Sequence, residues 1–214
     1  MALLDKDIRE PLFQFLEQTY HKIRIIEEKN MGRSRADILM VTEGALYGIE
    51  IKSDHDSYTR LARQVDDYDR FFDYNFAAVG SSHAGHIEEH IPDYWGIITI
   101  DEVDGKPDFY ILRRPQRNPR LDPSEKIRIL WRPELAHIQE LNDMPAYRNK
   151  SKLFVEQKIL ERVPPDVLRV QLSDELFERD YTTIRERINA YRTANGRKPR
   201  RRRRVRRKRY KSSM

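Results

Sequence analysis

Two short apolar runs joined by a tight turn constrain the fold of this chain most. "RADILMV" at 35–41 and "LYGIEIK" at 46–52 are typical of β-strands, and the "TEGA" between them contains the glycine that a hairpin turn favours. Three charged residues, Asp37, Glu50 and Lys52, interrupt the two runs. Asp and Lys are poor strand formers, and an unpaired buried charge is costly. The runs therefore predict a β-hairpin that carries a polar site.

The turn determines which of these charged residues share a face of the sheet. With the turn centred on Glu43 and Gly44, Asp37 lies directly opposite Glu50. Directly paired residues have Cβ atoms about 5 Å apart on one face, and residues two apart on a strand share a face at about 7 Å. The register thus predicts that Asp37, Glu50 and Lys52 lie together, unless a β-bulge shifts the hairpin.

This combination of side chains predicts metal-assisted chemistry on a phosphate. Two adjacent carboxylates repel each other without a cation, and Mg²⁺ suits one or two carboxylates together with waters and phosphate oxygens. The lysine beside them could position a water or stabilise charge on a phosphate oxygen. The alternative is a cross-strand salt bridge on an exposed sheet face, worth up to about 1 kcal/mol.

The periodicity of the remaining chain predicts an α/β (α+β) fold. Apolar residues at helical spacing predict a helix over 7–20, which starts at an Asp7–Glu10 capping box, and a second helix over about 61–72. We expect further strands over 22–28, 75–80, 95–100 and 109–114, with a short helix over 85–90. Helices that alternate with strands in this order predict a mixed central sheet flanked by helices.

The chain divides into three regions by composition. A proline-rich connector, "RPQRNPRLDPS", separates the sheet region at 1–120 from charged helix-period segments, which we expect to form a helical appendage over 121–195. The third region, 196–214, holds twelve of the 41 Lys and Arg residues and no acid, so the first 195 residues carry a net charge of −6 and the tail +12.

A tail of this composition cannot bury enough apolar surface to fold, so we expect it to be disordered. Its charge favours salt-sensitive attachment to nucleic acid, although a localisation signal and a solubilising end are alternatives. The residues expected to bind nucleic acid are Arg201, Arg202, Arg203, Arg204, Arg206, Arg207, Lys208 and Arg209.

Composition excludes several other classes of protein. With no cysteine, the chain has no disulfide, thiolate zinc site or cysteine nucleophile, and it suits a reducing compartment. No apolar run reaches the ~20 residues that cross a bilayer, and the acidic N-terminus is unlike a signal peptide. We therefore expect a cytoplasmic protein with no membrane partner.

The hairpin and the helix after it resemble a known group of enzymes. Asp37, Glu50-Ile51-Lys52 and a following helix with Gln64 resemble the PD-(D/E)XK nuclease superfamily, in its small RecB-like and DNA-repair-associated bacterial and phage branches. The resemblance covers about the first half of the chain and implies a restriction-endonuclease-like core. One departure is Ala36, which stands where the motif has proline.

The resemblance also implies roles for individual residues. Asp37, Glu50 and Ile51 would hold Mg²⁺ or Mn²⁺, Lys52 would be the catalytic lysine, and Gln64 would support them. Members usually add an acid from the first helix; the candidates for an additional acid are Glu10, Glu17 and Glu28.

We therefore expect a metal-dependent deoxyribonuclease. Two alternatives remain: a non-catalytic nucleic-acid-binding or assembly protein that retains the nuclease fold, and an interaction module whose tail engages an acidic protein. DNA is the expected partner, with RNA, a homodimer and protein partners left open. We expect His83 and His86 at the surface, and Tyr94 and Trp95 in or near the core rather than as base-stacking platforms.

Overall fold

The computed structural model describes residues 5–53, 56–179, 190 and 193. Its contacts divide the chain into two units, Met1–Glu178 and Arg179–Met214. The first unit contains every helix and strand discussed below. The basic tail at 196–214, with its eight expected nucleic-acid-binding residues, and much of 179–195 lie outside the described residues.

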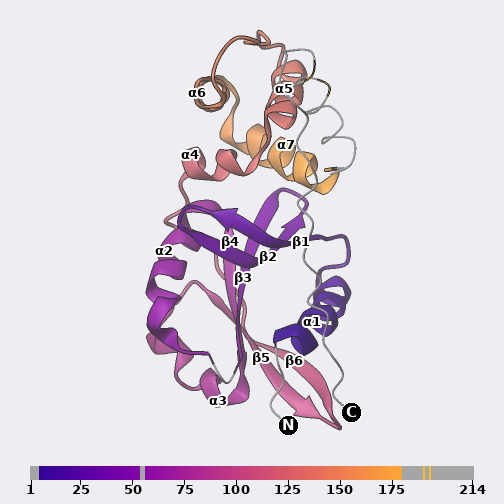
Figure 1. Cartoon of the computed structure of the whole chain (residues 1–214), viewed down its shortest axis with the longest axis vertical. Coiled ribbons are helices and arrows are strands. Elements are labelled where there is room, and N and C mark those ends of the chain that lie inside the picture. The colour runs from indigo at the N-terminus through magenta and orange to yellow at the C-terminus, as the bar shows by residue number, and fades with distance from the viewer. Residues whose placement is uncertain (1–4, 54–55, 180–189, 191–192, 194–214) are drawn as a thin grey trace. The chain divides into compact units, whose positions relative to one another are not determined.

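A six-stranded mixed sheet forms the centre of the first unit, with its strands in chain order (Figure 1). The strands are β1 (Arg24–Met31), β2 (Ser34–Thr42), β3 (Ala45–Lys52), β4 (Tyr74–Gly80), β5 (Gly96–Val103) and β6 (Lys106–Arg113). The pairs β1–β2, β2–β3 and β5–β6 are antiparallel, whereas β3–β4 and β4–β5 are parallel. The parallel strands therefore all end at the same edge of the sheet.

The helices flank this sheet and extend beyond it. They are α1 (Asp5–Tyr20), the short 3₁₀ helix η1 (Tyr58–Arg60), α2 (Leu61–Phe71), α3 (Ser81–Ala84), η2 (Ile87–Glu89), α4 (Pro123–Lys126), η3 (Ile127–Ile129), α5 (Arg132–Leu141), α6 (Lys152–Arg162) and α7 (Pro165–Phe177). The predicted α/β fold, a mixed sheet flanked by helices, is confirmed. None of the helices in the described part of the chain has the length and apolar character needed to cross a bilayer.

Two local predictions about helices are wrong. The helix expected over 85–90 is only the 3₁₀ turn η2, because α3 has already ended at Ala84 and Gly85 is a poor helix former. The first helix begins at Asp5, so Asp7 and Glu10 lie inside it rather than at its start.

Each face of the sheet has its own apolar core. Ile8, Leu12 and Leu16 of α1 pack against one face, where strand residues such as Ile49 and Phe76 join them. The opposite face is covered by α2 and by the C-terminal helices, which share a single larger core. Figure 1 shows α1 and α2 on opposite sides of the strands. Glu50 and Lys52 alternate with Ile49 and Ile51, so they face α2.

The C-terminal helices up to Glu178 belong to the same compact unit as the sheet. The guanidinium of Arg169 in α7 donates a 2.7 Å hydrogen bond to the carbonyl of Gly44 in the β2–β3 turn, and the Gly44 N–H donates to Ser173 Oγ at 2.8 Å. A buried ion pair joins Lys126 Nζ to Asp73 Oδ2 at 2.6 Å. The two Gly44 contacts tie the turn of the hairpin to α7.

Candidate active site

The β2–β3 hairpin has the register that its turn predicts. Ile38 pairs with Ile49, and the ladder continues without a bulge to Thr42 and Ala45. Gly44 has φ of 73°, which the turn requires. Asp37 lies one residue beyond the last pair, and its Oδ2 accepts a 3.0 Å hydrogen bond from the backbone N–H of Ile51. The structure thus brings Asp37 to Glu50-Ile51-Lys52.

The β1–β2 ladder is interrupted at Asp37. The β1–β2 ladder pairs Glu27 with Ile38 and Lys29 with Ala36, but it skips Glu28 opposite Asp37. Glu28 has φ of 50°, a left-handed conformation that non-glycine residues seldom adopt. The Asp37 N–H donates instead to the hydroxyl of Tyr68 in α2, at 3.2 Å. Backbone strain of this kind gathers at functional sites.

Glu50, Lys52 and Gln64 form a closed network. The Glu50 side chain is only 2% exposed, and Lys52 Nζ lies 2.8 Å from its Oε1. Lys52 Nζ also donates to Gln64 Oε1 at 3.1 Å, and Gln64 Nε2 donates to Glu50 Oε1. The four residues expected to be catalytic, Asp37 included, therefore lie in one cluster. The exposed salt bridge of the alternative interpretation is wrong for Glu50, because this carboxylate is buried.

Tyr68 completes the cluster from within the core. Its side chain is fully buried, and its hydroxyl donates to Glu50 Oε2 at 2.8 Å. The same hydroxyl lies 3.2 Å from the Ile49 carbonyl and accepts the Asp37 N–H. It therefore joins β2 and β3 at the two acidic residues. In the sequence Tyr68 is one of the residues at helical spacing that predict this helix, and sequence reasoning assigned it no separate role.

The electrostatics of Glu50 show why a cation would suit this cluster. Burial raises the pKa of the Glu50 carboxyl, and the Asp37 charge raises it further. The Lys52 ammonium and the hydrogen bonds from Lys52 and Tyr68 act in the opposite direction. A second positive charge beside the two carboxylates would relieve both the desolvation and the repulsion.

No hydrogen bond or ion pair among the described residues joins the three candidates for an additional acid to Glu50. Glu10 and Glu17 in α1 are exposed, and Glu28 pairs instead with Arg35 at 3.3 Å, with both side chains more than half exposed. Helix α1 contributes Arg9, whose Nη2 lies 3.4 Å from Asp37 Oδ1. An additional acidic ligand from these three residues therefore stays a prediction.

The histidines and aromatic residues named in the sequence analysis lie away from the Glu50 cluster or pack in the core. Asp69 accepts hydrogen bonds from Tyr94 Oη at 2.6 Å and from Trp95 Nε1 at 2.9 Å, and Trp95 is fully buried. His86 is exposed, as expected, whereas His83 is half-buried against the Tyr58 ring at 5.2 Å. None of these side chains contacts the Glu50 cluster through a hydrogen bond found among the described residues.

Comparison with known proteins places the chain in a phage family. The model of the family described as "Bacteriophage P4 protein cII" matches residues 3–206. The chain belongs to this family. Among solved structures, Pyrococcus furiosus SfsA in complex with Ca²⁺ is similar over 54% of this chain and 66% of that chain, with 13% sequence identity and a TM-score of 0.34. No curated protein matches this chain.

The donor set of the cluster fits a hard divalent cation. Carboxylate oxygens suit Mg²⁺ and Mn²⁺. In the described part of the chain, Tyr68 is the one hydrogen-bond partner of Glu50 Oε2, and a carboxylate oxygen accepts about two such bonds. No group of three or more His, Asp or Glu side chains within the described residues could hold a metal. Waters and substrate oxygens would therefore complete the coordination around Asp37 and Glu50.

Proposed function

We propose that this protein is a divalent-metal-dependent nuclease that hydrolyses phosphodiester bonds in DNA. The observation that carries the proposal is the cluster of Asp37, Glu50, Lys52 and Gln64 at the end of β3. In open α/β sheets, ligands bind beyond the carboxyl ends of the parallel strands, and β3 ends at Lys52. Apart from Ala36, which stands where the motif has proline, the pattern of Asp37 and Glu50-Ile51-Lys52 also resembles the motif of the PD-(D/E)XK nucleases.

Asp37 on β2, together with the neighbours Glu50 and Ile51 on β3, would hold Mg²⁺ or Mn²⁺. The Ile51 N–H orients the Asp37 carboxylate, and Tyr68 orients that of Glu50. When bound, the cation would lower the pKa of a bound water and offset charge on the phosphate.

Lys52 supplies the remaining positive charge. An ammonium group has three donors. In the described part of the chain two of them are directed to Glu50 Oε1 and Gln64 Oε1, which leaves one for a water or a phosphate oxygen. Gln64 bonds to both Glu50 and Lys52, so it holds the lysine at the edge of the carboxylate pair. Stabilisation of charge that develops on the phosphate is the expected contribution of Lys52.

The proposal is tested by cleavage of a nucleic-acid panel. Supercoiled, linear, nicked, single-stranded and branched DNA, with RNA beside them, are incubated with the full chain and Mg²⁺, Mn²⁺ or EDTA. We expect DNA cleavage that requires the metal and is lost in Asp37→Ala and Lys52→Ala, both folded by circular dichroism. A folded wild-type chain that binds the panel but cuts nothing would overturn the nuclease proposal and favour a nucleic-acid-binding protein that retains the fold.

A further inference from the structure

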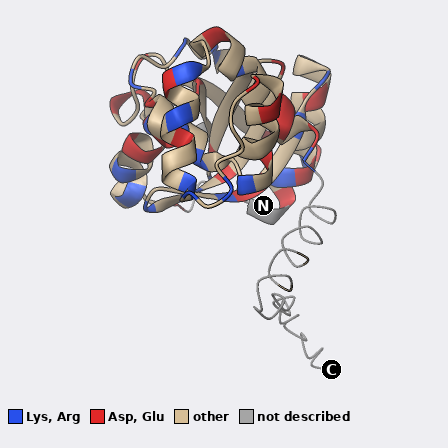
Figure 2. Cartoon of the chain, turned by 90° about the horizontal axis from the view of Figure 1, so that it is seen from above, with Lys and Arg blue, Asp and Glu red and all other residues tan. Residues whose placement is uncertain are grey.

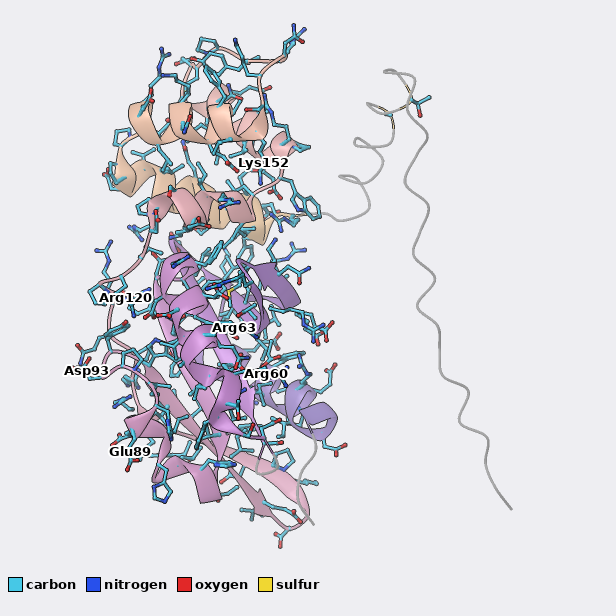
Figure 3. All side chains as sticks on the ribbon, turned by 60° about the vertical axis from the view of Figure 1, so that its left-hand side comes forward. Arg60, Arg63, Glu89, Asp93, Arg120 and Lys152 are labelled. Carbon is cyan, nitrogen blue, oxygen red and sulfur yellow. The ribbon has the colours of Figure 1, made fainter. Side chains whose placement is uncertain are left out.

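Two exposed arginines, Arg60 and Arg63, precede Gln64 in sequence, at the start of α2. Arg60 ends η1 and Arg63 lies in the first turn of α2. Figure 3 shows both side chains along the same part of this helix. Neither makes a hydrogen bond or an ion pair with another described residue. By contrast, Arg120 is held by Asp66 at 3.2 Å and by Asp69 at 3.4 Å.

The position of Arg60 follows from the spacing of the helix. Arg60, Gln64 and Tyr68 are four residues apart, so they lie one above another on one face. Tyr68 is fully buried, Gln64 is partly exposed and Arg60 is exposed. This face therefore runs from the closed end of the Glu50 cluster to the protein surface, with Arg60 at the open end.

The position of these arginines beside the Glu50 cluster matters because the surrounding surface is not basic. Lys and Arg are interspersed with Asp and Glu over the described elements (Figure 2), and the first 195 residues carry a net negative charge. Such a body repels a polyanion except where basic side chains are left without acidic partners. A guanidinium is always charged, and its planar fork matches the oxygens of a phosphate group.

We propose that Arg60 and Arg63 bind two backbone phosphates of the nucleic-acid strand that enters the Glu50 cluster. Residues three apart on a helix have Cβ atoms about 5–6 Å apart, so the two guanidinium groups can reach neighbouring phosphates of one strand. Contacts to phosphate position a strand without reading its sequence. The inference rests on the proposed nuclease function and adds how the substrate is held there.

The test compares the salt dependence of DNA binding in two matched double variants. Arg60→Gln/Arg63→Gln removes the proposed contacts. Arg148→Gln/Arg162→Gln removes the same charge from two other exposed arginines, one just before α6 and one at its end. Helix α6 lies on the far side of α4 from the sheet (Figure 1). Full-length chains are titrated by fluorescence anisotropy into a labelled 20-base-pair duplex, in EDTA so that no metal-dependent cleavage occurs. The basic tail is present in every chain and cancels from the comparison.

Each phosphate contact contributes about −0.9 to the slope of log K against log salt. We expect the slope of the Arg60/Arg63 variant to be shallower than wild type by about 1.8, so that the wild-type advantage falls about tenfold between 50 and 200 mM salt. The Arg148/Arg162 variant should keep the wild-type slope. An Arg60/Arg63 slope equal to wild type, or equal changes in both variants, would overturn the inference.

Because binding is measured without metal, the result is independent of hydrolysis. A chain that never cleaves DNA can still lose two phosphate contacts, and the nuclease proposal then fails alone. A chain that cleaves normally but shows no change of slope refutes only the role of Arg60 and Arg63.

Discussion

Replacing Tyr68 with phenylalanine should destabilise the fold at the candidate site without leaving a cavity. The change removes one oxygen from a fully buried ring. A hydroxyl has one proton, and the shorter contact, 2.8 Å to Glu50 Oε2, is the donated bond rather than the 3.2 Å contact to Ile49 O. The hydroxyl also accepts the Asp37 N–H, so the substitution removes two hydrogen bonds, one of them to a carboxylate.

The size of the effect follows from these two bonds. A hydrogen bond to a charged group contributes about 1.5–3 kcal/mol and a neutral one about 1 kcal/mol, so the free energy of unfolding should fall by about 2–4 kcal/mol. Urea denaturation at pH 7 in EDTA measures it. Tyr110→Phe is the control, because the Tyr110 side chain is 67% exposed on β6 and should change stability by less than about 0.5 kcal/mol. A Tyr68→Phe chain as stable as Tyr110→Phe would refute the reasoning.

Two further predictions concern the same cluster. Because the folded-state pKa of Glu50 is raised above its ordinary value of 4.5, its contribution to stability is present below that value and lost as pH rises through the raised pKa. In EDTA, the stability of wild type relative to Glu50→Gln should therefore fall as pH rises from 4.5 towards neutrality, and parallel curves from urea denaturation would contradict this. Gly48→Ala should cost about 1–3 kcal/mol, since its Cβ would lie 2.2 Å from Phe72 Cδ2 and 2.5 Å from Tyr68 Cδ1. Gly85→Ala, whose Cβ would meet nothing within 4 Å, is the control for thermal denaturation, and equal melting temperatures in the two variants would be inconsistent with that crowding.

The hairpin could be predicted because its determinants are local. A glycine at the turn, together with strand alternation, sets the register of Ile38 with Ile49 and places Asp37 near Glu50. The helix after it was predictable from the apolar spacing of Leu61, Val65 and Tyr68. These signals lie within a few residues of the structure that they specify.

The remaining features of the site depend on contacts between distant segments. Arg9 reaches Asp37 across 28 residues of sequence, and no local pattern distinguishes it from an ordinary surface arginine of an amphipathic helix. The left-handed backbone at Glu28 is equally hidden, because nothing in "KIRIIEE" signals a break in the strand. The resemblance implied an acidic residue from α1, and the structure places the arginine Arg9 of α1 beside Asp37.

The proposed nuclease requires that Asp37 and Glu50 together hold one divalent cation, and Mn²⁺ binding measured by electron paramagnetic resonance tests this directly. The full chain is titrated beside Asp37→Asn and beside Asp101→Asn, which alters an exposed acid on β5. We expect wild type and Asp101→Asn each to bind one Mn²⁺, and we expect the affinity to fall at least about tenfold in Asp37→Asn, as for the loss of a ligand worth about 1.4 kcal/mol or more. Mn²⁺ binding that is absent from wild type, or unchanged in Asp37→Asn, would contradict the proposed nuclease.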